Sequence, residues 1–371
     1  MIESGGSERD VGSRVSLGVY AVTHAVVDCT CAAVFFWAVR AGLIGGAAVL
    51  YAALVYNALA FALQPLLGLA IDRLDAPRAA GVAGCLITAA AVPLALLAHV
   101  VVPALVVAGL GNAVFHLGGG IVSLRHSPGK ATAPGIFVAP GAAGLFVGAA
   151  IARAGGPVWP FAALLLVLAV AVALFGRSRH APVAATVSSA RARPGIEWAI
   201  LLVMVVVALR AFTGGAIGFV WKVVPTLAVA LVIAVVLGKM LGGVVADRFG
   251  LRAAAIGALV VSLPLLVLGY GAPVAGVAGI LVFNMTMPVT LVAIATPLPG
   301  HEGFAFGLTC LALFAGAVLL VLGIGAGLSA FPLAVLTLVG AAALIAGLTR
   351  LAGPRSVAGK IPRVTTEEAA G

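Results

Sequence analysis

Charged side chains are scarce in this sequence. Only 9% of the 371 residues are Asp, Glu, Lys or Arg, whereas 63% are hydrophobic. A globular protein of this length would lack the polar surface that it needs in water. Apolar runs of about 20 residues, the length that crosses a bilayer as a helix, follow one another with short interruptions. Because polar and apolar side chains do not alternate in these runs, we expect helices and not barrel strands.

Cysteine is also rare. All four cysteines fall within apolar runs: Cys29, Cys31, Cys85 and Cys310. Cys29 and Cys31 are two residues apart, so they face different directions on a helix. The pattern predicts no disulfide framework and no zinc site, and we expect no cofactor.

Twelve apolar segments of membrane-spanning length divide the sequence. We expect helices at 15–39, 46–71, 79–98, 101–123, 132–152, 157–176, 196–220, 224–246, 253–271, 275–297, 303–327 and 331–350. The first is longer than the core of a secretory signal and eleven further segments follow it, so we interpret it as a span. The predicted fold is an all-α integral membrane protein of twelve transmembrane helices.

Basic residues outnumber acidic ones by 21 to 11 and give a net charge of +10. If the N-terminus is cytoplasmic, 16 basic residues lie in cytoplasmic segments, three (Arg40, Arg153, Lys222) in external ones and two (Arg210, Lys239) within spans. This asymmetry follows the positive-inside rule. It accounts for the charge without nucleic acid, which we do not expect as a partner. We predict a multi-pass protein of a bacterial inner membrane with both termini cytoplasmic.

The two halves of the sequence repeat each other. Gly68, Asp72 and Arg73 recur 175 residues later, and Asn112, Gly135 and Gly144 recur 172 residues later. Six spans separate the partners, so the repeat unit is a bundle of six helices and the two copies are parallel. The predicted parts are an N-terminal tail (1–14), a first bundle (15–176), a cytoplasmic linker (177–195), a second bundle (196–351) and a cytoplasmic tail (352–371).

A pattern of Gly, Asp and Arg follows the second span and again the eighth. Its residues are Gly68, Asp72, Arg73 and Arg78 in one copy and Gly243, Asp247, Arg248 and Arg252 in the other. Gly permits close helix contact, Asp can cap or pair at a helix end, and Arg can meet anionic lipid or pair across the bundle interface. Topological anchoring by the arginines alone is the alternative. The pattern resembles the loop signature of the major facilitator superfamily, which implies two six-helix bundles that transport a solute.

Four segments resemble the fosmidomycin-resistance branch of that superfamily. They are THAVVD (23–28), LQPLLGLAID (63–72), GLGNAVFH (109–116) and LPGHEGFAFG (298–307). The resemblance implies a proton-driven exporter of drugs or small metabolites. The fifth span lacks the polar Gln and Asn usual in that branch, and Leu117 stands where Pro is usual, so the substrate can differ.

Ionisable residues within the spans are few, and each costs roughly 2.5–3.5 kcal/mol at a helix centre. Asp28 is the only acidic residue deep within a predicted span. Tyr20, His24 and Asp28 are four residues apart and share one helix face. We predict that Asp28 is the proton-coupling residue and that His24 modulates its proton affinity. A permanently paired structural carboxylate is the alternative.

Arg210 is the predicted partner of Asp28. When the seventh span is aligned with the first at an offset of 182 residues, Arg210 takes the position of Asp28. Both lie about 20 Å from the cytoplasmic helix ends. In the superfamily helices 1, 4, 7 and 10 line the central cavity, so the resemblance implies that these residues face each other. We hypothesise that they pair in one state of the transport cycle and separate in another. Direct binding of an anionic substrate by Arg210, or a structural role, is the alternative.

The remaining polar groups of the lining helices are candidates for substrate binding. With Arg210, they are Tyr20, Asn112, His116, Asn284 and Thr286. For the histidines, a hydrogen bond between helices is the alternative. The side chains of His24, Asp28, Asn112 and His116 suit a transition metal, but the sequence shows no dense cluster of ligands, so we predict no metal site. Pro288 is expected to bend the tenth helix.

These features predict a secondary active transporter that moves a small amphipathic or anionic solute by alternating access, as a proton-coupled exporter acting through Asp28. Uptake or facilitated passage of a small organic anion is one alternative, and a non-transporting receptor or scaffold with a relic carrier fold is another. No nucleophile and base, carboxylate pair or metal motif lies at membrane depth, so we do not expect an enzyme. The expected partners of this monomer are its solute, protons and membrane lipids.

Overall fold

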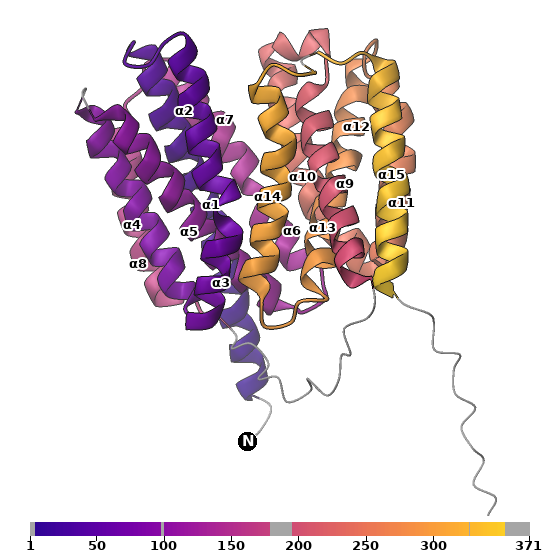
Figure 1. The fold of residues 1–371 in the computed structure, drawn as a ribbon. Coiled ribbons are helices and arrows are strands. Elements are labelled where there is room, and N and C mark those ends of the chain that lie inside the picture. The colour runs from indigo at the N-terminus through magenta and orange to yellow at the C-terminus, as the bar shows by residue number, and fades with distance from the viewer. Residues whose placement is uncertain (1–3, 98–99, 179–194, 326, 353–371) are drawn as a thin grey trace, which may run out of the picture.

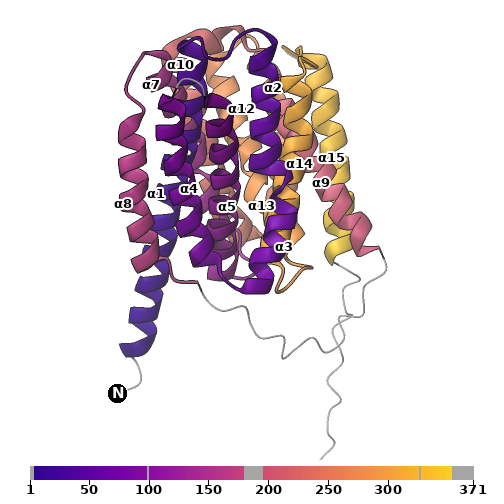
Figure 2. The same cartoon turned by 60° about the vertical axis from the view of Figure 1, so that its left-hand side comes forward.

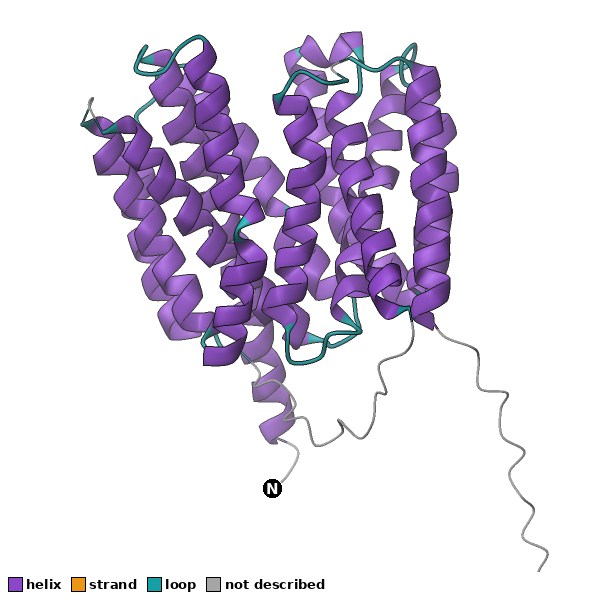
Figure 3. Ribbon diagram, in the orientation of Figure 1, coloured by secondary structure: helices purple, strands orange, loops and turns teal. Residues whose placement is uncertain are grey.

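The structure is a computed structural model that describes residues 4–97, 100–178, 195–325 and 327–352. Within these ranges it consists of helices and short connections, without a strand (Figure 3). Eleven of the described helical segments are long and apolar enough to cross a membrane, and Trp159–Phe175 is a shorter apolar helix. Together they account for the twelve predicted spans and confirm the predicted all-α membrane architecture.

The first six spans are built from nine helical elements, because two spans are interrupted. The elements are α1 (Ser4–Arg40), α2 (Ala47–Asn57), η1 (Ala58–Ala62), α3 (Gln64–Leu74), α4 (Pro77–Leu96), α5 (Val101–His126), α6 (Thr132–Val138), α7 (Pro140–Arg153) and α8 (Trp159–Phe175). The π-helical turn η1 joins α2 to α3 in the second span. The fifth span breaks between α6 and α7 at Pro140, which has no N–H to continue the helical hydrogen bonds.

The last six spans contain one comparable break. The elements are α9 (Ile196–Ala216), η2 (Val220–Val223), α10 (Pro225–Phe249), α11 (Leu251–Leu268), α12 (Pro273–Asn284), α13 (Thr286–Ala295), α14 (Glu302–Val321) and α15 (Ala330–Ala352). The tenth span breaks between α12 and α13. Asn284 lies four residues before Pro288, so its carbonyl receives no helical hydrogen bond from that residue. The tenth span is therefore interrupted close to the position where the bend was predicted.

The start of the first helix differs from the sequence prediction. Helix α1 begins at Ser4, ahead of the predicted start at residue 15, and extends beyond the rest of the bundle (Figure 1). Most of the predicted N-terminal tail is thus helical. The predicted linker and C-terminal tail lie outside the described residues, apart from their first residues and the last residue of the linker.

The helices form two bundles that lie side by side (Figures 1 and 2). We call them the N half (α1–α8) and the C half (α9–α15). Helix α1 begins and α15 ends at the same end of the molecule, which we call the terminal face; the other end is the opposite face. Helix α3 packs against α14, and α6 against α10, across the interface between the halves.

Glycine allows backbone contact at both of these crossings. A Cβ atom on Gly135 of α6 would lie 2.7 Å from the carbonyl oxygen of Lys239 in α10. A Cβ atom on Gly307 of α14 would lie 2.5 Å from the nitrogen of Pro65 in α3. Gly135 and Gly307 are partners in the sequence repeat. The same close crossing is therefore built twice, as expected of two similar six-helix halves.

A second pair of repeat partners packs the helices within each half. A Cβ atom on Gly144 would overlap the carbonyl oxygen of Ala25 in α1, and one on Gly316 would overlap that of Ala208 in α9. In each half, the fifth span therefore lies directly on the backbone of the first. This contact sets the position of α1, which carries Asp28.

Replacing Gly144 with Ala should destabilise the protein, because the methyl group has no space beside the Ala25 carbonyl. Overpacking costs about 1–3 kcal/mol, and more where backbone must move. We expect a thermal midpoint several degrees lower, measured by circular dichroism in detergent. Gly257→Ala on α11 is the matched control, because nothing lies within 4 Å of its added methyl group. Equal midpoints for the two variants would contradict this packing.

Candidate functional site

Asp72 joins the halves at the terminal face. This residue, near the end of α3, accepts hydrogen bonds from the backbone nitrogens of Gly303 at 2.8 Å and Phe304 at 2.9 Å. Both nitrogens belong to the first turn of α14 in the C half. Unpaired N–H groups and the helix dipole favour an anion at this position. Asp72 is therefore a cap for a helix of the opposite half.

Asp247 makes the reciprocal contact. Near the end of α10, it accepts hydrogen bonds from the backbone nitrogens of Ala131 at 2.6 Å and Thr132 at 3.0 Å. These nitrogens lie at the start of α6 in the N half. The repeat partners Asp72 and Asp247 thus cap helices in opposite directions across one interface. The halves are held together at the terminal face by both copies of the motif.

A buried arginine adds ion pairs at the same face. Arg125, near the end of α5, lies 2.5 Å from Asp75 through Nη1 and 3.2 Å from Glu302 through Nε. Asp75 belongs to the N half and Glu302 to the C half, so the guanidinium group bridges them. A buried charge that loses its partner is costly. This role of Arg125 was not predicted from the sequence, because Asp75 and Glu302 lie 50 and 177 residues away along the chain.

The four arginines of the motif take no part in this closure. Arg73, Arg78, Arg248 and Arg252 are exposed, and none forms an ion pair within the described part of the chain. Arg125 makes the pairing across the interface that was expected of them. Their exposure at the terminal face leaves them accessible to lipid headgroups.

A cluster of polar side chains is buried near the middle of the first span. His24 and Asp28 of α1 meet Asn112 and His116 of α5, and each of the four is at most 6% exposed. Asp28 Oδ2 lies 3.2 Å from His24 Nε2, and Asp28 Oδ1 lies 3.6 Å from His116 Nε2. The Asn112 amide donates to Asp28 Oδ1 at 2.9 Å. The structure thus brings together two residue pairs that the sequence analysis placed on separate helices.

Backbone carbonyls set the tautomer of both histidines in the cluster. His24 Nδ1 bonds to the carbonyl oxygen of Phe137 at 2.7 Å, and His116 Nδ1 bonds to that of Asn112 at 2.8 Å. A carbonyl oxygen only accepts, so Nδ1 carries the hydrogen and Nε2 of the neutral ring presents a lone pair. Both lone pairs face the carboxylate of Asp28. This arrangement is repulsive until a cation, a proton or a metal ion, lies between them.

The cluster corrects one expectation from the sequence. No dense set of metal ligands was expected, yet His24, Asp28 and His116 each offer one donor atom, and these atoms all lie within 4.8 Å of one another. The ligands come from two helices that are far apart in the sequence. Spacing along either helix alone could not show that they converge.

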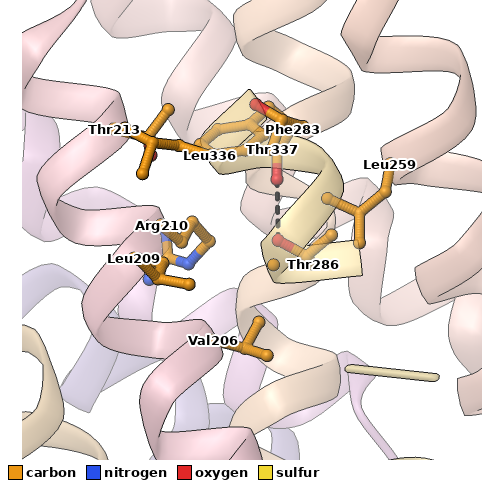
Figure 4. A pocket seen from close by; sticks show the side chains of 10 residues that line it. Val206, Leu209, Arg210, Thr213, Leu259, Phe283, Thr286, Leu336 and Thr337 are labelled. Atoms are coloured by element: carbon orange, nitrogen blue, oxygen red, sulfur yellow. Dashed lines mark hydrogen bonds between the residues drawn. The ribbon is translucent and has the colours of Figure 1, made fainter. Parts of the chain in front are cut away.

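Arg210 of α9 is partly buried within the C half. It borders a cavity of about 10 Å³, which we call the C-half cavity, among side chains of α9, α11, α12, α13 and α15 (Figure 4). Its Nε atom is buried without a hydrogen-bond partner. Asp28 instead faces α5 within the N half, so the predicted ion pair is not made in this structure. Its formation in another state stays a prediction.

Lys239 is a second cation of the C half at membrane depth, and the sequence analysis gave it no role. Its Nζ donates to the carbonyl oxygen of Val138, where α6 ends, at 3.2 Å. Within the described ranges neither Lys239 nor Arg210 pairs with a carboxylate. The C half therefore presents two positive charges without a counterion.

The other predicted substrate-binding residues are less clearly placed for that role. Tyr20 is buried, with its ring near Phe115 and its side chain directed at Gly81 of α4, so it packs inside the N half. Asn284 and Thr286 each donate to a backbone carbonyl of their own span at 2.8 Å. Of these, Thr286 lines the C-half cavity (Figure 4).

No protein-family model and no curated protein matches the sequence. Solved structures match it closely in fold. The E. coli fucose:proton symporter superposes with a TM-score of 0.68 at 11% identity, over 91% of this chain and 98% of that chain. A structure of a fucose symporter described as a major facilitator superfamily transporter in the outward conformation has a TM-score of 0.63 at 13% identity, over 90% and 99%. The human organic anion transporter TETRAN has a TM-score of 0.64 at 15% identity, over 90% and 99%. The chain therefore has the major facilitator fold.

Replacing Asp72 with Ala should expose the start of α14 to exchange with solvent, because two backbone N–H groups lose their acceptor. Losing such a cap costs about 1–2 kcal/mol, which corresponds to roughly 5–30-fold faster exchange. Hydrogen exchange with mass spectrometry on peptides covering residues 302–306 measures it.

Asp247→Ala is the matched variant for this measurement. It should accelerate exchange at the start of α6 and have little effect at the start of α14. Exchange that is unchanged in both variants, or that rises equally at both sites in each, would show that the two caps do not act as described.

Proposed function

We propose that the protein is a secondary active transporter that moves a small solute across a bacterial inner membrane by alternating access. The observation that carries this proposal is the interface between the halves. At the terminal face the halves are joined by helix caps and one ion pair, which rigid motion of the halves can break. Uncompensated polar groups lie deeper on both sides of the interface. A receptor or scaffold would need neither feature.

The distribution of basic residues supports an orientation with the terminal face in the cytoplasm. Arg40, Arg153 and Lys222 lie towards the opposite face, whereas the basic ends of α3, α5, α10 and α15 lie at the terminal face. By the positive-inside rule, both termini are then cytoplasmic. The described conformation is accordingly one that is closed towards the cytoplasm. The fold match to a symporter in the outward conformation is consistent with this assignment.

We infer that the cluster around Asp28 carries the coupling proton. Two histidine lone pairs and a carboxylate converge in a buried space, and a proton held between them removes their mutual repulsion. Because all the groups belong to α1 and α5, the cluster moves with the N half as a unit. Lys239 of the C half donates to the carbonyl oxygen of Val138 in the N half, so separation of the halves moves its positive charge relative to the cluster.

The solute proposed for this site is small and amphipathic or anionic. Arg210 and Lys239 supply positive charge at membrane depth, and apolar side chains surround them. A solute carboxylate or similar anion would provide the counterion that these residues lack. Among the similar structures, the human protein is named as an organic anion transporter, which supports this class.

Export is the proposed direction, and it rests on the four sequence segments that resemble the fosmidomycin-resistance branch. We also propose that the protein acts as a monomer and that membrane lipids contact the exposed arginines of the terminal face. Uptake of a small organic anion remains the second candidate, because the same two cations would serve it.

Asp28→Asn should uncouple transport from protons, because the amide cannot bind and release a proton. In proteoliposomes we expect the wild type to acidify or alkalise the lumen when a transported anion is added, and the variant to show solute flux without proton movement. A fluorescent pH indicator and a radiolabelled solute report the two quantities.

Glu197→Gln is the control for this experiment, because it neutralises an exposed carboxylate in the first turn of α9, outside the cluster. It should retain coupling. Full coupling in Asp28→Asn would remove the proton role of Asp28, and a wild type that binds solutes without any flux would support a receptor.

Arg210→Ala should weaken binding of anionic solutes, whereas neutral analogues should bind about equally to both proteins. Loss of one charged hydrogen-bond partner corresponds to roughly 10–100-fold weaker binding. Thermal stabilisation of the purified protein across a panel of small organic anions measures it. Anions that stabilise Arg210→Ala and the wild type equally would contradict the role of Arg210.

A further inference from the structure

We propose that His24, Asp28 and His116 form a binding site for a divalent transition-metal ion. Two imidazole nitrogens and one carboxylate suit Zn²⁺, Co²⁺, Ni²⁺ or Fe²⁺, whereas Mg²⁺ and Ca²⁺ take oxygen ligands. The arrangement of the donor atoms supports this metal site whether or not the protein transports a solute.

The distances between the donor atoms fit a metal ion. In a tetrahedral site with metal–ligand bonds of ~2.0–2.2 Å, neighbouring donor atoms are roughly 3.3–3.6 Å apart. Asp28 Oδ2 lies 3.2 Å from His24 Nε2, and the other carboxylate oxygen, Oδ1, lies 3.6 Å from His116 Nε2. One donor atom from each of the three residues lies within 4.8 Å of the other two, so side-chain rotations can bring all three to one ion.

The groups behind the ligands hold them in the orientation that metal binding needs. Ligating histidines commonly donate their second N–H to a carbonyl or carboxylate, which sets the tautomer and directs the lone pair at the metal. Here the carbonyls of Phe137 and Asn112 accept from Nδ1 of His24 and His116. The Asn112 amide holds one carboxylate oxygen of Asp28. All three ligands are therefore oriented before any ion arrives.

Gly141 of α7 leaves space beside the ligands. A Cβ atom at this position would lie 2.5 Å from His24 Nε2 and would overlap Asp28 Oδ2. Any other residue would push into the gap between these two donor atoms. The absence of a side chain at 141 thus keeps one side of the site open, while the ring of Phe137 stacks on His24 with centroids 4.8 Å apart.

A fourth position remains for a ligand outside the protein. Three protein donors leave a tetrahedral ion with one open site, which water usually fills. The Oδ1 atom of Asn112 is buried and has no hydrogen-bond partner. It belongs to the amide that holds Asp28, so it lies next to the cluster. A metal-bound water can donate to this oxygen and satisfy it.

The site can be tested with Co²⁺, whose visible absorption rises strongly when it becomes four-coordinate. Full-length protein without a histidine tag is purified in detergent, stripped with EDTA and titrated. We expect one equivalent of Co²⁺ to produce the absorption and Zn²⁺ to displace it. His24→Gln and His116→Gln should abolish stoichiometric binding. Gly141→Ala, which keeps all three ligands, should weaken it ~10-fold or more by displacing them.

Two variants serve as matched controls. His301→Gln changes an exposed histidine, and Gly257→Ala adds a methyl group where nothing lies within 4 Å, so both should bind Co²⁺ as the wild type does. Thermal midpoints show which variants are folded. A wild type that binds no stoichiometric Co²⁺, or binding that is unchanged in His24→Gln, His116→Gln and Gly141→Ala, would overturn the metal site.

The same preparations separate this inference from the proposed transport. Protein that moves solute in proteoliposomes but binds no Co²⁺ would remove the metal site alone and leave the proton as the bound cation. Protein that binds one equivalent of Co²⁺ through the cluster but moves no solute would remove the transport proposal alone.

Discussion

Two carboxylates cap helices of the opposite half and hold the halves together at the terminal face. Asp72 holds the start of α14 and Asp247 holds the start of α6, each through two backbone hydrogen bonds. The loss of one such cap costs about 1–2 kcal/mol. Glycine at both crossings brings the backbones of the two halves into contact.

The two halves carry charges of opposite sign at membrane depth. The N half holds a carboxylate against two histidine lone pairs, and the C half holds Arg210 and Lys239 without a carboxylate partner. Each arrangement is unfavourable by itself in a medium of low dielectric. A cation bound by the first and an anion bound by the second would relieve both. The opposite charges of the two halves therefore link the proposed coupling ion to the proposed solute.

The sequence contained most of the architecture and only part of the site. Hydrophobic length showed the twelve spans, and the repeated Asp of the motif showed the two halves, because both signals are local in the sequence. The alignment of Asp28 with Arg210 predicted that both residues lie at the same depth in the membrane. It did not predict how each helix is rotated about its axis, so it could not show whether the two side chains face each other. The meeting of His24 with His116 depends on close packing of α1, α5 and α7. Lys239 and Arg125 were visible as basic residues, but their partners lie in other helices.

Distance measurements between the halves test the central claim most directly. Spin labels at Leu74→Cys in α3 and Phe249→Cys in α10 report on the terminal face, because both positions are exposed, at 75% and 64%, and the four native cysteines are buried. The account predicts one short distance in the parent protein and a second, longer population when Asp72 and Asp247 are both replaced by Ala. Labels at Tyr51 and Val220, towards the opposite face, should then move closer together. An unchanged single distance at both faces would contradict the account.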